Sequence, residues 1–100
     1  MEADCLKVPV VQTDQFILYI EDVDGYWFIH CDVLTKWNKA VKHNLKLWFK
    51  RLTDECGKEL FALHTPEDKK HEKFLKIFNF SYLHSIKGND SKNYDIYIWR

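Results

Sequence analysis

The chain has 100 residues, of which 46% are hydrophobic and 16% aromatic, with only 3 glycines and 2 prolines. This length supports one domain with a single core, and this composition excludes a disordered or low-complexity chain. The 15 basic and 15 acidic side chains give a formal net charge of zero, whereas nucleic-acid coat proteins and membrane-surface proteins normally carry a basic excess.

The start of the chain and its cysteines both favour the cytoplasm. The opening residues, MEADCLKVPVVQ, carry an acid where a signal peptide has its basic region, and no apolar run approaches ~18 residues. Cys5, Cys31 and Cys56 are widely spaced and form no C-x-x-C pair. We therefore expect a cytoplasmic protein with three reduced, mostly buried thiols and no membrane segment.

The first elements in chain order are predicted strands. Residues 1–15 are predicted to be irregular or an edge strand, because Pro9 lacks the backbone donor that an inner strand needs. Two apolar, β-rich runs at 16–20 and 26–31 flank an Asp-Val-Asp-Gly segment at 22–25. A short Asp-Gly connection between such runs predicts a β-hairpin.

The clearest helix is predicted over residues 35–55, with Thr35 as its N-cap and Gly57 as its stop. Its apolar residues recur every three or four positions and form one continuous stripe: Leu34, Trp37, Val41, Leu45, Trp48 and Leu52. The opposite face is rich in lysine. We interpret it as a solvated face rather than a phosphate-binding one, because no arginine lies there and the net charge is zero.

The second half of the chain alternates strand and helix again. Strands are predicted at 59–64, 80–87 and 94–99, and a helix over 65–78 that begins with the N-cap Thr-Pro-Glu-Asp pattern. A strand–helix–strand crossover predicts that the strands at 26–32 and 59–64 are parallel. We therefore predict an α/β (α+β) single domain with a mixed, twisted sheet of five to six strands, a central parallel pair and two helices.

This element order, together with the segment HEKFLKIFNF at 71–80, resembles the GCN5-related N-acetyltransferase (GNAT) family. The WF pair at 27–28, the HxxFL motif in that segment and the closing YxIY at 94–97 are similar to small GNAT-like proteins of tailed bacteriophages. One such protein in short-tailed coliphages is linked to assembly of the internal virion components. The resemblance covers residues 16–100 as a core and implies one GNAT-like domain over 1–100.

The sequence departs from the GNAT pattern at the cofactor and catalytic positions. The family binds acetyl-CoA through a glycine-containing loop before its long helix, whereas residues 32–39 here contain no glycine. The family tyrosine that protonates the leaving thiolate falls at Leu75, and the glycine that follows falls at Asn79. We therefore expect no catalytic residue and no cofactor. If an acetyl-CoA site survives, the resemblance places it at Thr35, Lys36 and Asn38.

The remaining histidines and cysteines suggest no standard chemical site. No HxxxH or HExxH pair is present, so no metal site is expected. His30 and Cys31 are adjacent and point to opposite faces of a strand, which favours a buried thiol over a nucleophile. We expect His71 to be a hydrogen-bonded packing residue, and His64 is a candidate general base at the end of its strand.

Together these features predict a phage-type GNAT-like protein that acts by protein–protein contacts, in virion assembly or in inhibition of a host or defence factor. The sequence does not choose between these two roles. The candidate contact residues combine exposed apolar side chains with lysines: Tyr97, Trp99, Leu47, Phe49, Lys39, Lys46 and Lys50. The alternatives are an acetyl-CoA-dependent N-acetyltransferase with a non-standard loop, and nucleic-acid binding by the lysine face. A homodimer through the terminal strands also stays open.

Overall fold

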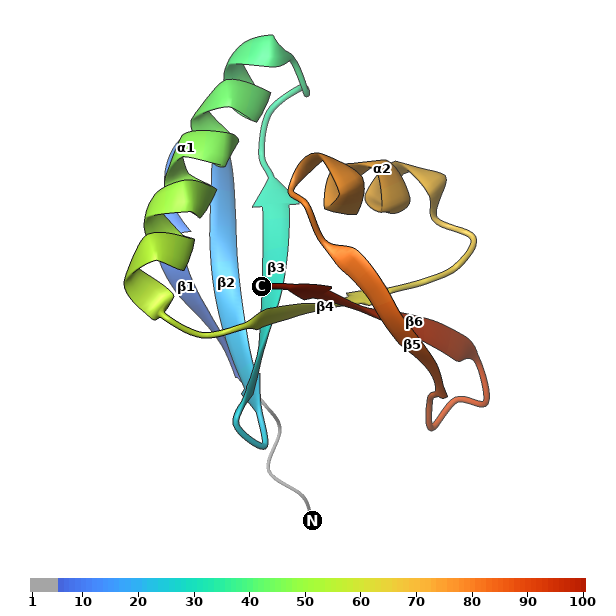
Figure 1. Ribbon diagram of the computed structural model, residues 1–100. Coiled ribbons are helices and arrows are strands. Elements are labelled where there is room, and N and C mark those ends of the chain that lie inside the picture. The colour runs from blue at the N-terminus through green and yellow to red at the C-terminus, as the bar shows by residue number, and fades with distance from the viewer. Residues whose placement is uncertain (1–5) are drawn as a thin grey trace. The chain divides into compact units, whose positions relative to one another are not determined.

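The computed structural model describes residues 6–100, which divide into two compact units, residues 6–58 and residues 59–100 (Figure 1). Each unit contains three strands and one helix. The predicted α+β class, with six strands and two helices, is confirmed. The parallel pairing expected between the strands at 26–32 and 59–64 would join the two units, and it stays a prediction.

The first unit contains an antiparallel sheet of β1 (Lys7–Gln12), β2 (Phe16–Val23) and β3 (Tyr26–Val33). The register of β1 against β2 shifts between Pro9 and Val11, so a bulge lies beside the proline. The edge-strand prediction thus holds for the described part of residues 1–15. Residues 1–5, which include Cys5, lie outside the described residues.

The hairpin between β2 and β3 confirms the Asp-Gly prediction. Val23 pairs with Tyr26, and the two residues between them, Asp24 and Gly25, have φ angles of 54° and 89°. Two successive positive φ angles are typical of a type I′ turn, whose twist matches that of the flanking strands. Asp22 fixes the turn, because its Oδ1 accepts a hydrogen bond from the Gly25 amide at 2.8 Å.

The long helix α1 (Lys39–Cys56) begins later than predicted. Its N-cap is Asn38 rather than Thr35, because Asn38 has an extended backbone and its Oδ1 accepts from the Val41 amide at 2.9 Å. Asparagine caps a helix at least as well as threonine, so the helix can begin after Asn38 at no cost in capping. The predicted stop is confirmed, since Gly57 lies in the left-handed region with φ 64°.

The buried face of α1 is also rotated relative to the predicted stripe. Val41, Leu45, Phe49 and Thr53 are buried at four-residue intervals. Trp48, predicted to be buried, is 37% exposed, and Trp37 lies before the helix and is 41% exposed. From Leu45 both a three-residue and a four-residue step keep to one helix face, and packing has selected Phe49.

The second unit contains β4 (Leu60–His64), β5 (Ser81–Lys87) and β6 (Asn93–Trp99), with β6 antiparallel to both of the others. Ile96, Tyr97 and Ile98 of β6 are consecutive and all buried. Every residue of β5 is exposed.

The helix of the second unit, α2 (Lys69–Ile77), is capped by Asp68 rather than by the predicted Thr65. The Asp68 Oδ1 accepts from the His71 amide at 3.0 Å, while the Asp68 amide donates to the Thr65 carbonyl at 2.9 Å. Thr65 therefore starts a turn that precedes the helix. After the helix, Asn79 has φ 64°, and the Phe80 amide donates to the Leu75 carbonyl at 3.0 Å. Within residues 6–100, no helix combines the length and the hydropathy needed to cross a membrane.

Candidate functional site

A row of polar side chains crosses the sheet of the second unit. His64 on β4 pairs with Asp95 on β6, and Asp95 pairs with Ser85 on β5. Directly opposed residues of antiparallel strands share one face of the sheet and have neighbouring Cβ atoms. Three residues that are far apart in the sequence therefore lie side by side, and only the strand register brings them together.

The exposed end of this row is a chain of hydroxyl groups leading to the Asp95 carboxylate. The Ser85 hydroxyl donates to Asp95 Oδ1 at 2.7 Å, and the Tyr82 hydroxyl lies 2.8 Å from Ser85 Oγ. Because the Ser85 hydrogen is given to the carboxylate, Tyr82 is the donor to Ser85. Ser85 contacts the carboxylate directly, without an imidazole between them, so this is not the arrangement of a Ser–His–Asp triad.

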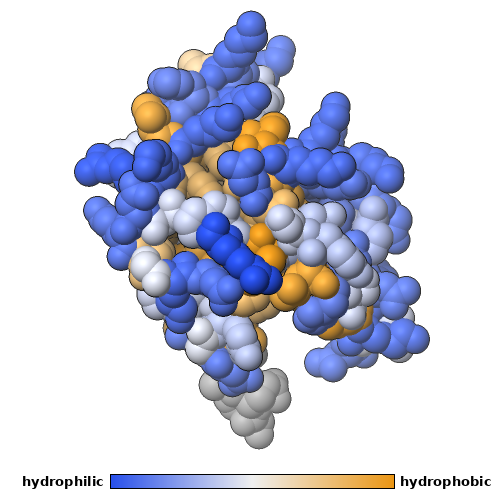
Figure 2. All heavy atoms as spheres, in the orientation of Figure 1, coloured by the Kyte–Doolittle hydropathy of each residue, from blue (hydrophilic) through white to orange (hydrophobic). Residues whose placement is uncertain are grey.

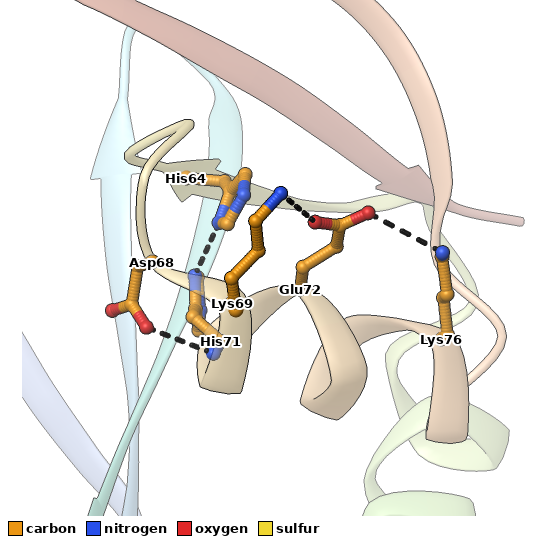
Figure 3. A network of polar contacts seen from close by, with 6 residues as sticks. All are labelled: His64, Asp68, Lys69, His71, Glu72 and Lys76. Carbon is orange, nitrogen blue, oxygen red and sulfur yellow. Dashed lines mark hydrogen bonds and ion pairs between the residues drawn. The ribbon is translucent and has the colours of Figure 1, made fainter.

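The buried end of the row is a pair of histidines. His64 and His71 point toward one another in Figure 3, and their Nδ1 atoms are 2.9 Å apart. His64 is 1% exposed and packs nearly perpendicular to the Tyr97 ring, with 5.4 Å between centroids. The prediction that His71 is a hydrogen-bonded packing residue is confirmed. The general-base role suggested for His64 stays a prediction, and its Nδ1 is already engaged by His71.

Charged side chains follow the histidine pair along α2. Glu72 stands between two lysines, with Lys69 Nζ at 4.0 Å and Lys76 Nζ at 3.3 Å from its carboxylate oxygens (Figure 3). Asp68 accepts from the backbone of His71 at the start of the helix. Among residues 6–100, no three His, Cys, Asp or Glu side chains gather closely enough to hold a metal ion.

The two described thiols are free and half-buried. Burial raises the pKa of Cys31 to about 12, with a further contribution from the negative charge of Asp32. His30 does not act as a base for this thiol, because its Nε2 is paired with the Glu21 carboxylate of the neighbouring strand at 2.8 Å. This environment favours the protonated thiol of Cys31 over the reactive thiolate.

The predicted acetyl-CoA residues lie at the start of α1. Thr35 and Lys36 are exposed in the segment before the helix. The Asn38 side-chain oxygen accepts a hydrogen bond from the Val41 amide, which is one of the helix N-terminal donors that a pyrophosphate would use. The chain itself therefore already uses one of these amides, and the acetyl-CoA site stays a prediction.

The outer face of α1 collects most of the predicted contact residues, and we use this name for Lys39, Lys46, Leu47, Trp48, Lys50 and Arg51. Leu47 is 52% exposed, and the Arg51 guanidinium lies over the Trp48 ring at 4.8 Å from its centroid. Lys50 forms an ion pair with Asp54 at 3.0 Å. On the face shown in Figure 2, hydrophilic side chains cover most of the region over α1, and hydrophobic ones show between them.

Two predicted contact residues are not available at the surface. Phe49 is only 8% exposed and Tyr97 only 9%, so the expectation that both are exposed is wrong. Phe49 lies one helical turn after the buried Leu45, and Tyr97 lies on β6, which has a strand on each side. Trp99 is half-buried.

Sequence reasoning missed two features of these sites. The stacking of Arg51 on Trp48 has a detectable signal, because residues three apart are neighbours on a helix surface. The row from Ser85 to His64 has no such signal, since it depends on the pairing of three strands.

Comparison with known proteins finds no relative. The chain matches no protein family model, no curated protein and no solved structure. The resemblance to the GNAT family therefore stays a prediction, and arguments about function rest on the side chains described above.

Proposed function

We propose that this protein is a small GNAT-like protein that acts by binding another protein through the outer face of α1, and not by catalysis. The supporting observation is the exposure of Leu47 and Trp48 amid basic residues on one helix. Trp and Arg are enriched among the anchors of protein interfaces, and the Trp48–Arg51 stack presents both together.

The charges of the outer face of α1 indicate what kind of partner surface would fit it. Lys39, Lys46 and Arg51 are exposed, whereas Lys50 is already paired with Asp54. A partner surface with acidic residues around an apolar centre would complement this arrangement, because opposite charges guide docking while the apolar contact supplies affinity. A nucleic acid would use the lysines but would leave Leu47 without an apolar contact.

The GNAT and phage assignments are part of the same proposal. The observed order of strands and helices is the order on which the resemblance rests. Asn79 stands where the family has glycine, and its φ of 64° is a conformation that glycine favours. We accordingly propose that the partner is a virion component or a host or defence factor, met in the cytoplasm of an infected cell.

Two positions support a binding role over acetyl transfer. Asn38 occupies a helix amide that the cofactor would need, and Leu75, at the position of the family tyrosine, is 2% exposed. Isothermal titration with acetyl-CoA tests this alternative. A dissociation constant below about 100 μM that Thr35→Ala or Asn38→Ala abolishes would replace the proposal with an enzyme.

Site-specific photo-cross-linking tests the binding surface. A photoreactive amino acid replaces Leu47 in one variant and the exposed Lys73 of α2 in a matched control, and both are irradiated in an infected-host lysate. We expect the Leu47 probe to cross-link one protein that the Lys73 probe does not. Equal cross-linking of the same proteins from both positions would contradict the proposal.

The contact is then tested by substitution with the purified partner. We expect the Lys46→Glu and Leu47→Asp variants each to weaken its binding by about tenfold or more, because one reverses a charge and the other places a charge in an apolar contact. Lys70→Glu, an exposed charge reversal on α2, serves as the control and should bind as the wild type does. Unchanged binding by Leu47→Asp would exclude the outer face of α1 as the interface.

A further inference from the structure

We infer that His64 and His71 form a proton-controlled latch that holds α2 against β4 when the rings share one hydrogen bond and opens when both rings are protonated. This inference is independent of the binding function proposed above. It rests on the 2.9 Å separation of the two Nδ1 atoms (Figure 3). The donor and the acceptor of this hydrogen bond are thus both histidine Nδ1 atoms. Such a bond needs one ring to donate from Nδ1 and the other to accept at Nδ1.

The number of protons on the pair therefore decides whether the bond exists. With both rings neutral, the donor ring carries its proton on Nδ1 and the acceptor ring carries its proton on Nε2. A first added proton goes to the Nε2 of the donor ring and leaves a charge-assisted N–H···N bond. A second added proton goes to the accepting Nδ1, so that two N–H groups face each other at 2.9 Å and the bond is lost.

The surroundings of the pair disfavour two positive charges at once. From α2, Lys69 and Lys76 are both paired with the Glu72 carboxylate, and Asp68 bonds the His71 backbone. From β6, Asp95 is the register partner of His64, and the Tyr97 and Phe74 rings contact His64 and His71 respectively. His64 is 1% exposed, so a second charge there would be poorly hydrated as well as opposed by the first.

The opening of this bond would act on the start of α2. His71 lies in the first turn of the helix, and His64 is the last residue of β4. When both rings are charged, their repulsion separates the helix from the strand end. The fold thus contains an acid-sensitive junction inside one unit.

Nitrogen-15 NMR of the histidine rings in the unmodified protein tests the latch directly. At about pH 7.5 we expect one of the two rings as the Nδ1–H tautomer and the other as the Nε2–H tautomer, joined by the hydrogen bond. On acidification we expect the conversion of the second ring to imidazolium to coincide with changed amide shifts in α2. Two Nε2–H tautomers at neutral pH, or two rings that titrate without affecting each other, would overturn the inference.

A double-mutant cycle with His64→Gln and His71→Gln measures the coupling between the rings. We expect the two changes to be coupled by about tenfold in the unfolding equilibrium constant at neutral pH, and by no more than about twofold in acid. The exposed His43 and His84, changed to glutamine, are matched controls and should show no pH-dependent coupling to His71. A coupling that is equally large at both pH values would show a packing contact and not a proton-controlled one.

Discussion

The Cys31 thiol shows how the fold changes the chemistry of a single residue. Cys31 is half-buried on β3, and burial together with Asp32 raises its pKa to about 12. Cys56, at the end of α1, also has a raised pKa, because of burial and the neighbouring Glu55, but Lys58 opposes that change. Alkylation requires the thiolate, so the two thiols should differ in reactivity.

We expect iodoacetamide at about pH 8 to modify Cys56 at least about tenfold faster than Cys31, because Cys31 is almost entirely protonated. Intact-protein mass spectrometry with peptide mapping measures both rates, in a Cys5→Ser background that removes the third thiol. Labelling in urea is the control and should make the rates equal. Faster labelling of Cys31 in the folded protein would contradict the assigned environment.

The same thiol predicts how stability depends on pH. Above about pH 9 a thiol in the unfolded chain loses its proton, whereas folded Cys31 keeps its proton up to about pH 12. The folded protein binds more protons than the unfolded chain in this interval, so the free energy of unfolding falls as pH rises. We expect urea titrations between about pH 8 and 10.5 to show a flatter decline for Cys31→Ala than for the wild type. Parallel curves would exclude this contribution.

At the scale of the element, the start of α1 depends on Asn38. Its side chain satisfies the Val41 amide, while Thr35 lies exposed outside the helix. We expect Asn38→Ala to lower the free energy of unfolding by about 1 kcal/mol, and Asn38→Asp to retain most of it. Thr35→Ala is the matched control and should change little. Urea denaturation measures all three variants. A larger loss of unfolding free energy for Thr35→Ala than for Asn38→Ala would indicate that Thr35 is the cap.

The buried face of α1 gives a second prediction, because of two nearby apolar residues it includes Phe49 and leaves Leu47 exposed. Phe49 is 8% exposed and Leu47 is 52% exposed. We expect Phe49→Ala to cost about 3–5 kcal/mol of unfolding free energy, since it leaves a cavity in the core. Leu47→Ala should stay within about 0.5 kcal/mol of the wild type. Equal losses in urea titrations would mean that the outer face of α1 is not a free surface.

At the scale of the whole molecule, the balance of charge bears on nucleic-acid binding. The 15 basic residues are matched by 15 acidic ones, and Lys50 is paired within its own helix. We expect no binding of labelled DNA or RNA tighter than about 100 μM at about 0.15 M salt, as measured by fluorescence anisotropy. Tight binding that weakens with salt and with Lys39→Glu or Lys46→Glu would favour the nucleic-acid alternative.

The local elements of this protein are largely predictable from its sequence. The Asp-Gly hairpin, the stop at Gly57 and the order of strands and helices depend on conformational preferences of a few neighbouring residues. The helix starts are less certain because two good capping residues compete within a few positions. Thr35 competes with Asn38, and Thr65 with Asp68, and in both places the later residue caps the helix.

The candidate sites depended on tertiary structure. Both Trp48 and Phe49 fit a helical spacing, and only packing of the helix decided which of them is buried. Ser85, Asp95 and His64 share a face because three strands pair in one register, which no local pattern encodes. The sequence by itself therefore determined the elements and the balanced charge, since these follow from neighbouring residues and composition. Tertiary structure decided which aromatic residues reach the surface and that two histidines share one hydrogen bond, since these depend on contacts between distant segments.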